Sequence, residues 1–312
     1  MSTTPTTEIP ALATDCHMHV YGPAERYPVA PSNPSPVPFA YDLAAYQAVK
    51  ARLGLGRTVV VQPSAYGLDN SATLDAVAAL SARPIHAAGD STGGDQRVLS
   101  ARLIHAAGDS TGCDQTRGAA RAVVAVTPET SDAELQRLHA AGARGARAVL
   151  LKHPLVAWED LARLGARVAP LGWHIQMQFD GMQMEAREAL IRALPCKVVI
   201  DHIGRFHESV TPDSAPVLAL RRLLETGRVW MKASSPYGVS RHADWRDTSA
   251  IARALIAAAP ERVVWGSNWP HPNEAPPKPD EARVLDWLAS VCPSEAVRQA
   301  VLVANPAQLY DF

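Results

Sequence analysis

The sequence predicts an α/β protein that folds as a single (β/α)₈ TIM-like barrel spanning residues 1–312. Eight short apolar runs recur along the chain, and most are followed by an amphipathic segment. Such alternation is typical of buried parallel strands joined by right-handed helical crossovers. The length of 312 residues exceeds the usual single domain but is ordinary for one barrel. A doubly wound open sheet is the alternative, but no Gly-x-Gly-x-x-Gly turn follows the first strand.

The order of elements follows from hydrophobic periodicity. The expected strands are residues 11–17, 58–61, 122–126, 146–151, 173–179, 197–200, 229–232 and 262–265. The expected helices between them include residues 41–53, 71–80, 132–141, 158–168, 184–194 and 215–226. The helix 71–80 has Asn70 or Ser71 in place for an N-cap. Residues 21–38 are rich in proline and predict a long irregular loop, a kind of segment that often serves function.

A tandem repeat interrupts the alternation between the second helix and the third strand. Residues 81–99 read SARPIHAAGDSTGGDQRVL, and residues 100–118 read SARLIHAAGDSTGCDQTRG. One interpretation is a paired ligand-binding module that duplicates His86, Asp90, His105 and Asp109. Two copies fall short of a stacked solenoid, so we favour a tolerated duplication. We expect residues 81–118 to form an exposed insertion on the barrel face opposite the active-site loops.

Composition excludes several classes of partner. The chain is 47% hydrophobic, carries a formal net charge of −1 and has no basic block, so we expect neither nucleic acid nor an anionic membrane. We find no secretory signal and no run near the roughly 18 apolar residues of a membrane span. The four cysteines (Cys16, Cys113, Cys196, Cys292) form no Cys-x-x-Cys pair, which favours reduced thiols and a cytoplasmic protein. The sequence leaves the oligomeric state open.

Polar side chains gather where the predicted strands end. His17 and His19 alternate on the first strand, so their side chains share one face. Other strand ends carry Gln62 and Ser64, Arg147, Gln176, Gln178 and Asp180, Asp201, His202 and Arg205, Lys232, Ser234 and Ser235, then Ser267, Asn268 and His271. Any one of these could cap a helix or face solvent. Because active sites of such barrels lie at the carboxyl ends of the strands, the full set predicts a site there.

Three motifs resemble those of a known superfamily. D-C-H-M-H at 15–19, V-I-D-H-I-G-R at 199–205 and W-G-S-N-W-P-H-P at 265–272 resemble the amidohydrolase superfamily. The similarity is greatest to the amidohydrolase-related branch that contains 2-pyrone-4,6-dicarboxylate lactonase and galactaro-δ-lactone isomerase. It spans the chain apart from the repeat. The resemblance implies a distorted barrel of the amidohydrolase type, with His17, His19 and His202 in its active site.

Two departures from the superfamily pattern bear on a metal. Many members bind divalent ions through the His-x-His pair, further histidines and an aspartate after strand eight. Here the fifth strand ends in Gln176 and Gln178, and the eighth is followed by Asn268. An amide is a neutral and weaker ligand than a carboxylate. We therefore predict no catalytic metal and no other cofactor, with a divalent ion such as zinc as the alternative.

Asn268 also bears on the reaction. An amide cannot accept a proton from water at neutral pH, whereas related lactonases use a carboxylate for that step. Isomerisation of a lactone needs no water, because a hydroxyl of the substrate attacks the ring carbonyl at high effective concentration. The isomerase group resembles this sequence at Asn268, at 178–181 and at Asp201-His202 followed by Gly204. We therefore predict conversion of a sugar-diacid δ-lactone to its γ-lactone.

The residues receive roles as predictions. His17, His19 and His202 polarise the carbonyl and pass protons, and Asn268 orients the substrate. Asp201 is expected to fix the tautomer of a histidine by contacting its ring, without touching the substrate itself. The expected substrate-binding residues are Arg205, Arg147, Ser64, Gln178, Asp180 and His271, the arginines pairing with a carboxylate. Capping is the alternative for Gln178 and Asp180, and a structural role for His271.

Two further readings of the function stay open. One is hydrolysis of a lactone such as 2-pyrone-4,6-dicarboxylate, with His202 or His271 as the base. The other is a barrel that binds a small acid without catalysis.

Overall fold

The computed structural model describes residues 3–31, 37–82, 119–151 and 154–312. Eight parallel strands form one sheet in the order β1 to β8. The strands are β1 (Thr14–Met18), β2 (Arg57–Val61), β3 (Ala120–Val124), β4 (Ala143–Val149), β5 (His174–Gln178), β6 (Lys197–Ile200), β7 (Val229–Ser234) and β8 (Val263–Gly266). The predicted (β/α)₈ barrel is confirmed.

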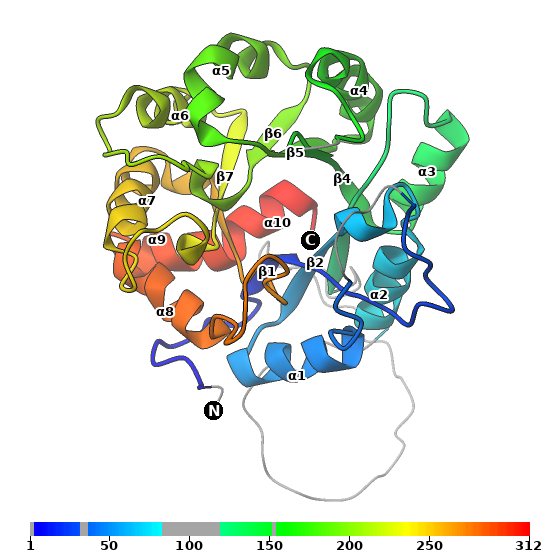
Figure 1. The fold of residues 1–312 in the computed structure, drawn as a ribbon, viewed down its shortest axis with the longest axis horizontal. Coiled ribbons are helices and arrows are strands. Elements are labelled where there is room, and N and C mark those ends of the chain that lie inside the picture. Colours follow the sequence, from blue (N-terminus) through cyan, green and yellow to red (C-terminus); the bar gives the residue numbers. More distant parts are fainter. Residues whose placement is uncertain (1–2, 32–36, 83–118, 152–153) are drawn as a thin grey trace, which may run out of the picture.

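Helices surround the strands, and α1 to α8 form the outer ring of the barrel (Figure 1). They are α1 (Leu43–Leu53), α2 (Ser71–Ser81), α3 (Asp132–Ala140), α4 (Leu161–Val168), α5 (Met184–Ala193), α6 (Ala215–Glu225), α7 (Arg246–Ala258), α8 (Glu281–Val291), α9 (Glu295–Gln299) and α10 (Asn305–Tyr310), with a π-helix at Ala300–Ala304 before α10. Short 3₁₀ turns follow several strands: Ser64–Tyr66, Gly181–Gln183, His202–Gly204 and Pro236–Gly238. Among the described residues, no helix is both long and apolar enough to cross a membrane.

Backbone hydrogen bonds join the first and last strands of the sheet. The amide of Asn268 donates to the carbonyl of His17 at 2.8 Å, and the amide of His19 donates to the carbonyl of Trp269 at 2.8 Å. Met18 and Trp269 form a parallel bridge. The loop after β8 is thereby fixed against the end of β1, which brings the D-C-H-M-H and W-G-S-N-W-P-H-P motifs together.

The barrel interior is filled by inward-facing apolar side chains. Val61, Val123 and Val264 belong to this buried cluster, as do Leu309 and Tyr310 of α10. Tyr310 also contacts His174 at the beginning of β5, with ring centroids 5.3 Å apart. Helix α10 therefore closes the amino-terminal end of the barrel, and the opposite end is left for the polar side chains.

Several boundaries differ from the prediction. The first strand begins at Thr14 rather than residue 11, because Leu12 has a positive φ of 65° that extended backbone excludes. Asn70 occupies the N-cap position of α2 but does not cap it. Its side chain instead exchanges two hydrogen bonds with the backbone of Ala125, just after β3. The repeat residues 83–118, with His86, Asp90, His105 and Asp109, lie outside the described residues.

Candidate active site

The two histidines of the first motif lie side by side at the end of β1, as their spacing predicts. Both are buried, and their ring centroids are 5.0 Å apart. His19 Nδ1 lies 2.8 Å from the carbonyl oxygen of Val61. A carbonyl only accepts, so the hydrogen of the His19 ring is on Nδ1 and Nε2 offers a lone pair.

Lys232 of β7 gives His17 the opposite tautomer. Its ammonium donates to the Cys16 carbonyl at 2.7 Å and to Gln176 Oε1 at 2.6 Å, and it lies 3.3 Å from His17 Nδ1. An ammonium has no lone pair, so His17 Nδ1 accepts and the ring hydrogen is on Nε2. That Nε2 is buried and has no hydrogen-bond partner within the described part of the chain. It is therefore a free donor.

Asp201 supports this arrangement from the end of β6. Its carboxylate accepts from Gln176 Nε2 at 3.1 Å and lies 4.0 Å from the Lys232 ammonium. It is also 3.4 Å from His17 Nδ1. All four side chains are buried. Asp201 thus supplies the negative charge that balances a buried cation behind His17.

His202 is the third histidine of the cluster. Its ring centroid is 4.7 Å from that of His17, and its Nδ1 lies 2.9 Å from Ser234 Oγ. Burial lowers the pKa of His17 and His202 well below 6.5, and Lys232 lowers that of His17 further. Burial and the Arg147 guanidinium lower the pKa of His19 to about 3. All three imidazoles are neutral at neutral pH, and they serve as hydrogen-bonding groups there.

The same cluster holds the donors that a metal would need. His17, Asp201 and His202 each offer a ligand atom, and these atoms lie within 4.8 Å of one another. However, the Lys232 ammonium lies 3.3 Å from His17 Nδ1 and 4.0 Å from Asp201. Burial lowers the Lys232 pKa to about 8, so the group is mainly a cation at neutral pH. A divalent ion on these donors would meet a positive charge, so they fit it poorly.

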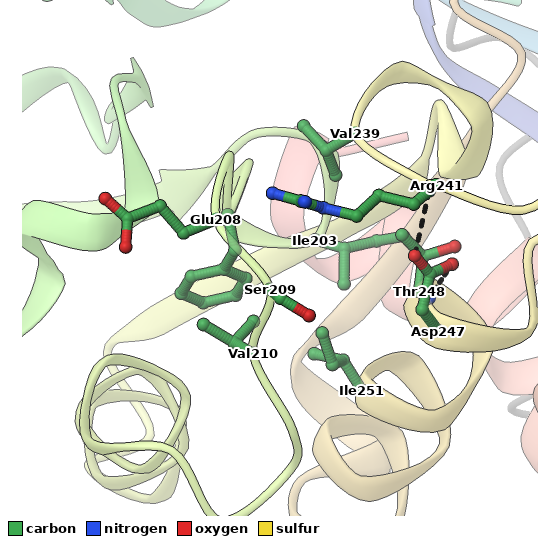
Figure 2. A pocket seen from close by; sticks show the side chains of 10 residues that line it. Ile203, Glu208, Ser209, Val210, Val239, Arg241, Asp247, Thr248 and Ile251 are labelled. Carbon is green, nitrogen blue, oxygen red and sulfur yellow. Dashed lines mark hydrogen bonds between the residues drawn. The ribbon is translucent and has the colours of Figure 1, made fainter.

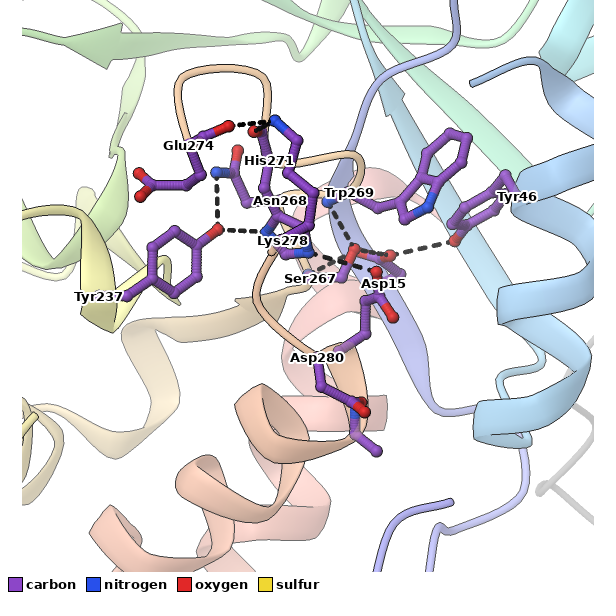
Figure 3. Close-up of polar contacts among 12 residues, drawn as sticks. Asp15, Tyr46, Tyr237, Ser267, Asn268, Trp269, His271, Glu274, Lys278 and Asp280 are labelled. Carbon is purple, nitrogen blue, oxygen red and sulfur yellow. Dashed lines mark hydrogen bonds and ion pairs between the residues drawn. The ribbon is translucent and has the colours of Figure 1, made fainter. Parts of the chain in front are cut away.

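Asn268 faces a second chain of polar groups, of which Figure 3 labels Tyr237 and His271. Its Nδ2 donates to the Tyr237 hydroxyl at 3.1 Å. The same hydroxyl contacts Nδ1 of His271, and His271 Nε2 lies 3.3 Å from Glu281 Oε1. Asn268 and Tyr237 are partly exposed, whereas His271 and Glu281 are buried. The chain therefore runs from the exposed end of the barrel into its wall.

Asp15 fixes β1 to the loop after β8 (Figure 3). Its buried carboxylate accepts from Ser267 Oγ at 2.6 Å, from the Ser267 amide at 2.9 Å and from the His17 amide at 3.0 Å. The Tyr46 hydroxyl donates to it at 3.1 Å. Burial raises the Asp15 pKa in spite of these hydrogen bonds. Asp15 thus connects the backbone of His17 with the residue that precedes Asn268.

The predicted substrate-binding residues occupy different surroundings. Arg147 donates to the Gln62 carbonyl and, at 3.2 Å, to Gln178 Oε1, so these two side chains pair with each other. Ser64 is exposed, and within the described residues its hydroxyl makes no hydrogen bond to the histidine cluster. Asp180 accepts from the Met182 amide at 3.0 Å and so caps a 3₁₀ turn. Capping is the alternative role predicted for Asp180 from the sequence.

Arg205 follows His202 and is partly buried. Its backbone has a positive φ of 52°, and its Nε is buried without a hydrogen-bond partner among the described residues. Its carbonyl accepts from the Gly181 amide at 3.0 Å. A Cβ on Gly181 would lie 2.2 Å from the carbonyl oxygen of Gly204, so the loops after β5 and β6 can approach only because glycine is present.

Two of the cavities in the described part of the chain lie outside the histidine cluster. Figure 2 shows the smaller one, beside Ile203 and between the loops after β6 and β7. Its volume is about 20 Å³. Such a volume admits about one water molecule. Its Arg241 is held by the Asp247 carboxylate through the backbone amide. A larger cavity of about 460 Å³ lies along α1 and α2, lined by Tyr21, Tyr27 and several alanines.

Comparison with known proteins decides the family. The amidohydrolase family model matches residues 81–312. The chain belongs to the amidohydrolase family. It is 32% identical to a 2-pyrone-4,6-dicarboxylate hydrolase of Comamonas testosteroni, over 98% of this chain and 92% of the relative. It is 30% identical to a D-galactarolactone isomerase of Agrobacterium fabrum, over 99% of this chain and 94% of that protein. A solved apo structure from Agrobacterium tumefaciens aligns with a TM-score of 0.81 at 29% identity, covering 99% of each chain.

The resemblance to the amidohydrolase-related branch is therefore confirmed, and the protein is an enzyme of the amidohydrolase superfamily. Three groups of this amidohydrolase site were absent from the predicted functional residues. Lys232 stood among the polar strand ends, but its partners could not be read from sequence. Tyr237 follows β7 in a Ser-Pro-Tyr-Gly turn, which resembles any surface turn. Glu281 begins a helix, where an acidic residue needs no further explanation.

Proposed function

We propose that this amidohydrolase isomerises a lactone of a sugar diacid or a related dicarboxylate, converting a δ-lactone to a γ-lactone. The observation that carries the proposal is Asn268, an amide held beside His17 by a backbone hydrogen bond of 2.8 Å. An amide does not activate water. A hydroxyl on the substrate needs no such activation of solvent, because it is already held near the ring carbonyl. The D-galactarolactone isomerase relative, 30% identical, supports this reaction.

His17 and the neighbouring His202 polarise the ester carbonyl in the proposed mechanism. The tetrahedral intermediate places negative charge on the carbonyl oxygen, and a donor aimed at that oxygen stabilises it. His17 Nε2 is such a donor, buried and without another partner in the described structure. The Lys232 ammonium at 3.3 Å from the other ring nitrogen keeps the hydrogen on Nε2. His202 contacts the same oxygen, His19 accepts from a substrate hydroxyl through the lone pair of its Nε2, and Asp201 holds Lys232 in place.

Substrate recognition is assigned to the cationic side of the site. Arg205 pairs with a carboxylate of the substrate, since a guanidinium forms a bidentate fork with that group. Arg147 is the second candidate, although its terminal nitrogens donate to Gln62 and Gln178 in this structure. Arg205 supports this role through its buried, unpartnered Nε, as judged from the described residues. Ser64, Gln178 and Asp180 contact substrate hydroxyls, and Asn268 orients the ring. His271 contacts the substrate side of the site through Tyr237.

We further propose that catalysis requires no divalent metal and no other cofactor. The support is chemical: Lys232 already places a cation against His17 and Asp201. The enzyme is proposed to act in the cytoplasm, from its scattered cysteines and the absence of a Cys-x-x-Cys pair in the sequence.

Proton NMR of a hexaric-acid δ-lactone incubated with the enzyme tests the reaction. The γ-lactone should appear first, ahead of any open-chain diacid. Asn268→Asp should lower the isomerisation rate at least about 10-fold, because a carboxylate repels the developing oxyanion, and it should raise hydrolysis by supplying a base. Accumulation of the diacid without the γ-lactone would reject isomerisation. No conversion above the buffer rate would leave only a binding protein.

Hydrolysis is the second candidate, and one observation favours it: the 32% identical relative from Comamonas testosteroni is named a hydrolase. In that case His271 takes the place of the carboxylate as the base, because burial lowers the pKa of His202 well below its ordinary value. The same NMR experiment, with 2-pyrone-4,6-dicarboxylate as a parallel substrate, separates the two reactions.

A further inference from the structure

The proposed isomerisation needs a group that takes a proton from the attacking hydroxyl and returns it to the leaving ring oxygen. The three clustered histidines are poor choices, because burial lowers the pKa of each well below its ordinary value. They accept a proton only at a large cost. Another group at the same end of the barrel should therefore carry the proton.

Tyr237, His271 and Glu281 form a hydrogen-bonded chain in which each group donates to the next, from the tyrosine to the carboxylate. The Glu281 carboxylate also accepts from Arg52 at 2.5 Å. Burial raises the pKa of Glu281, but the hydrogen bonds and charges of His271 and Arg52 lower it by more, so the net pKa lies below its ordinary value. Glu281 is therefore ionised and can only accept, so His271 Nε2 carries the ring hydrogen. His271 Nδ1 is left with its lone pair facing the Tyr237 hydroxyl.

Asn268 completes the geometry from the other side. Its Nδ2 donates to the Tyr237 oxygen at 3.1 Å, so the phenolic hydrogen points toward His271. A hydroxyl, an imidazole and a carboxylate then follow one another as in hydrolases that activate a serine. Here the hydroxyl belongs to a partly exposed tyrosine beside Asn268, where the substrate is expected.

We propose that Tyr237 is the catalytic acid and base of the lactone reaction, and that His271 and Glu281 act through it as positioning residues. The proposal rests on the proposed function, since it assigns the proton transfer of that reaction.

The steps balance without a further reactant. As the substrate hydroxyl oxygen bonds to the ring carbonyl carbon, its hydrogen passes to the Tyr237 oxygen, and the Tyr237 hydrogen passes to His271 Nδ1. The imidazolium then lies against the Glu281 carboxylate. When the bond between the carbonyl carbon and the old ring oxygen breaks, that oxygen takes a hydrogen from Tyr237. His271 returns its proton to Tyr237, and both groups are restored.

A merely structural role for Tyr237 would be to hold Asn268. That role predicts weaker substrate binding when the hydroxyl is lost, whereas proton transfer predicts a slower chemical step with binding retained. The two are separated by kcat and KM for Tyr237→Phe, His271→Gln and the double variant. Tyr27→Phe is the matched control, because the Tyr27 hydroxyl donates to Asp75 at 2.7 Å in a different part of the fold.

We expect Tyr237→Phe to lower kcat at least about 100-fold and to leave KM within about three-fold. His271→Gln should cost nearly as much, and the double variant should be little slower than either, because the residues act as one unit. Arg205, Glu274 and Glu281, whose charges act on Tyr237, all remain in these variants. So does Lys278, which donates to the His271 carbonyl at 2.7 Å.

The outcomes separate the two proposals. A wild type that forms the γ-lactone while Tyr237→Phe keeps more than about a tenth of kcat rejects the proton carrier alone. Effects that multiply in the double variant reject it too. A wild type that hydrolyses the lactone, with the activity lost in Tyr237→Phe, rejects isomerisation and retains the proton carrier. If the wild type converts neither lactone, both proposals are wrong.

Discussion

Replacing Lys232 by methionine tests the electrostatic arrangement behind His17. The substitution keeps a similar length and removes the ammonium, with its hydrogen bonds to the Cys16 carbonyl and Gln176 Oε1 and its contact with His17 Nδ1. Asp201 is then a buried carboxylate without its cation, and His17 loses the group that fixes its tautomer. We expect the variant to be less stable and about 10–100-fold slower.

The magnitude follows from burial and charge. Breaking a buried ion pair on one side costs about 3–5 kcal/mol at neutral pH. The pKa of Lys232 is lowered from 10.5 to about 8 in the folded enzyme, with burial as the largest cause. Below pH 8 the lysine is protonated in both states. Between pH 8 and 10.5 the Lys232 side chain binds more protons in the unfolded chain than in the folded one. Its contribution to the free energy of unfolding therefore increases as the pH rises. From pH 7 to 9.5 the wild type should gain about 2 kcal/mol over Lys232→Met.

Urea unfolding at pH 7, 8, 9 and 9.5 measures this difference, because other titrating groups are common to both proteins. Lys197→Met, at an exposed lysine that begins β6, is the matched control and should follow the wild type. If the free energies of unfolding of Lys232→Met and wild type change with pH in parallel, the lowered pKa of the buried Lys232 is refuted. A Lys232→Met enzyme that keeps half of wild-type kcat would refute the role given to the His17 tautomer.

Two further predictions follow from the site. Dialysis against a chelator should leave kcat within about two-fold of the untreated enzyme, because we propose that Lys232, rather than a divalent ion, supplies the cation. Loss of activity that zinc restores would contradict this proposal. Gly266→Ala should lower the free energy of unfolding by about 1–3 kcal/mol and slow catalysis, because its Cβ would lie 2.6 Å from the Cβ of His17. A urea midpoint unchanged from wild type would contradict this, because it would mean that β1 and β8 move apart to admit the methyl group without loss of stability.

The strands could be predicted because buried parallel strands are continuous apolar runs, and most of the runs here are followed by an amphipathic helical segment. The strand-end rule then placed His17, His202 and Asn268 at one end of the barrel, and the structure brings their elements together. Boundaries were less accurate. The expected strand 11–17 begins at Thr14, since the positive φ at Leu12 depends on a turn that hydrophobicity does not encode.

The contacts within the site could not be predicted in the same way. Asp15 binds Ser267 across 252 residues of sequence, and Lys232 reaches Cys16 across 216. Such pairs depend on which strands close the barrel and how their side chains are packed. Asn70 illustrates the converse: its type suits an N-cap, yet a buried backbone group after β3 takes its side chain. Local preference is overruled where a buried donor or acceptor lacks a partner.

Backbone strain is concentrated where the proposed chemistry takes place. His202, Arg205, Ser235, Asn268 and His271 all have positive φ, and all follow β6, β7 or β8. Each such residue costs about 1–3 kcal/mol and persists only when its surroundings hold it. The holding groups are identifiable: Asp15 secures the loop after β8, and glycines allow the loops after β5 and β6 to approach. The apolar barrel therefore stabilises a strained rim, and the rim sets the directions in which His202, Asn268 and His271 point.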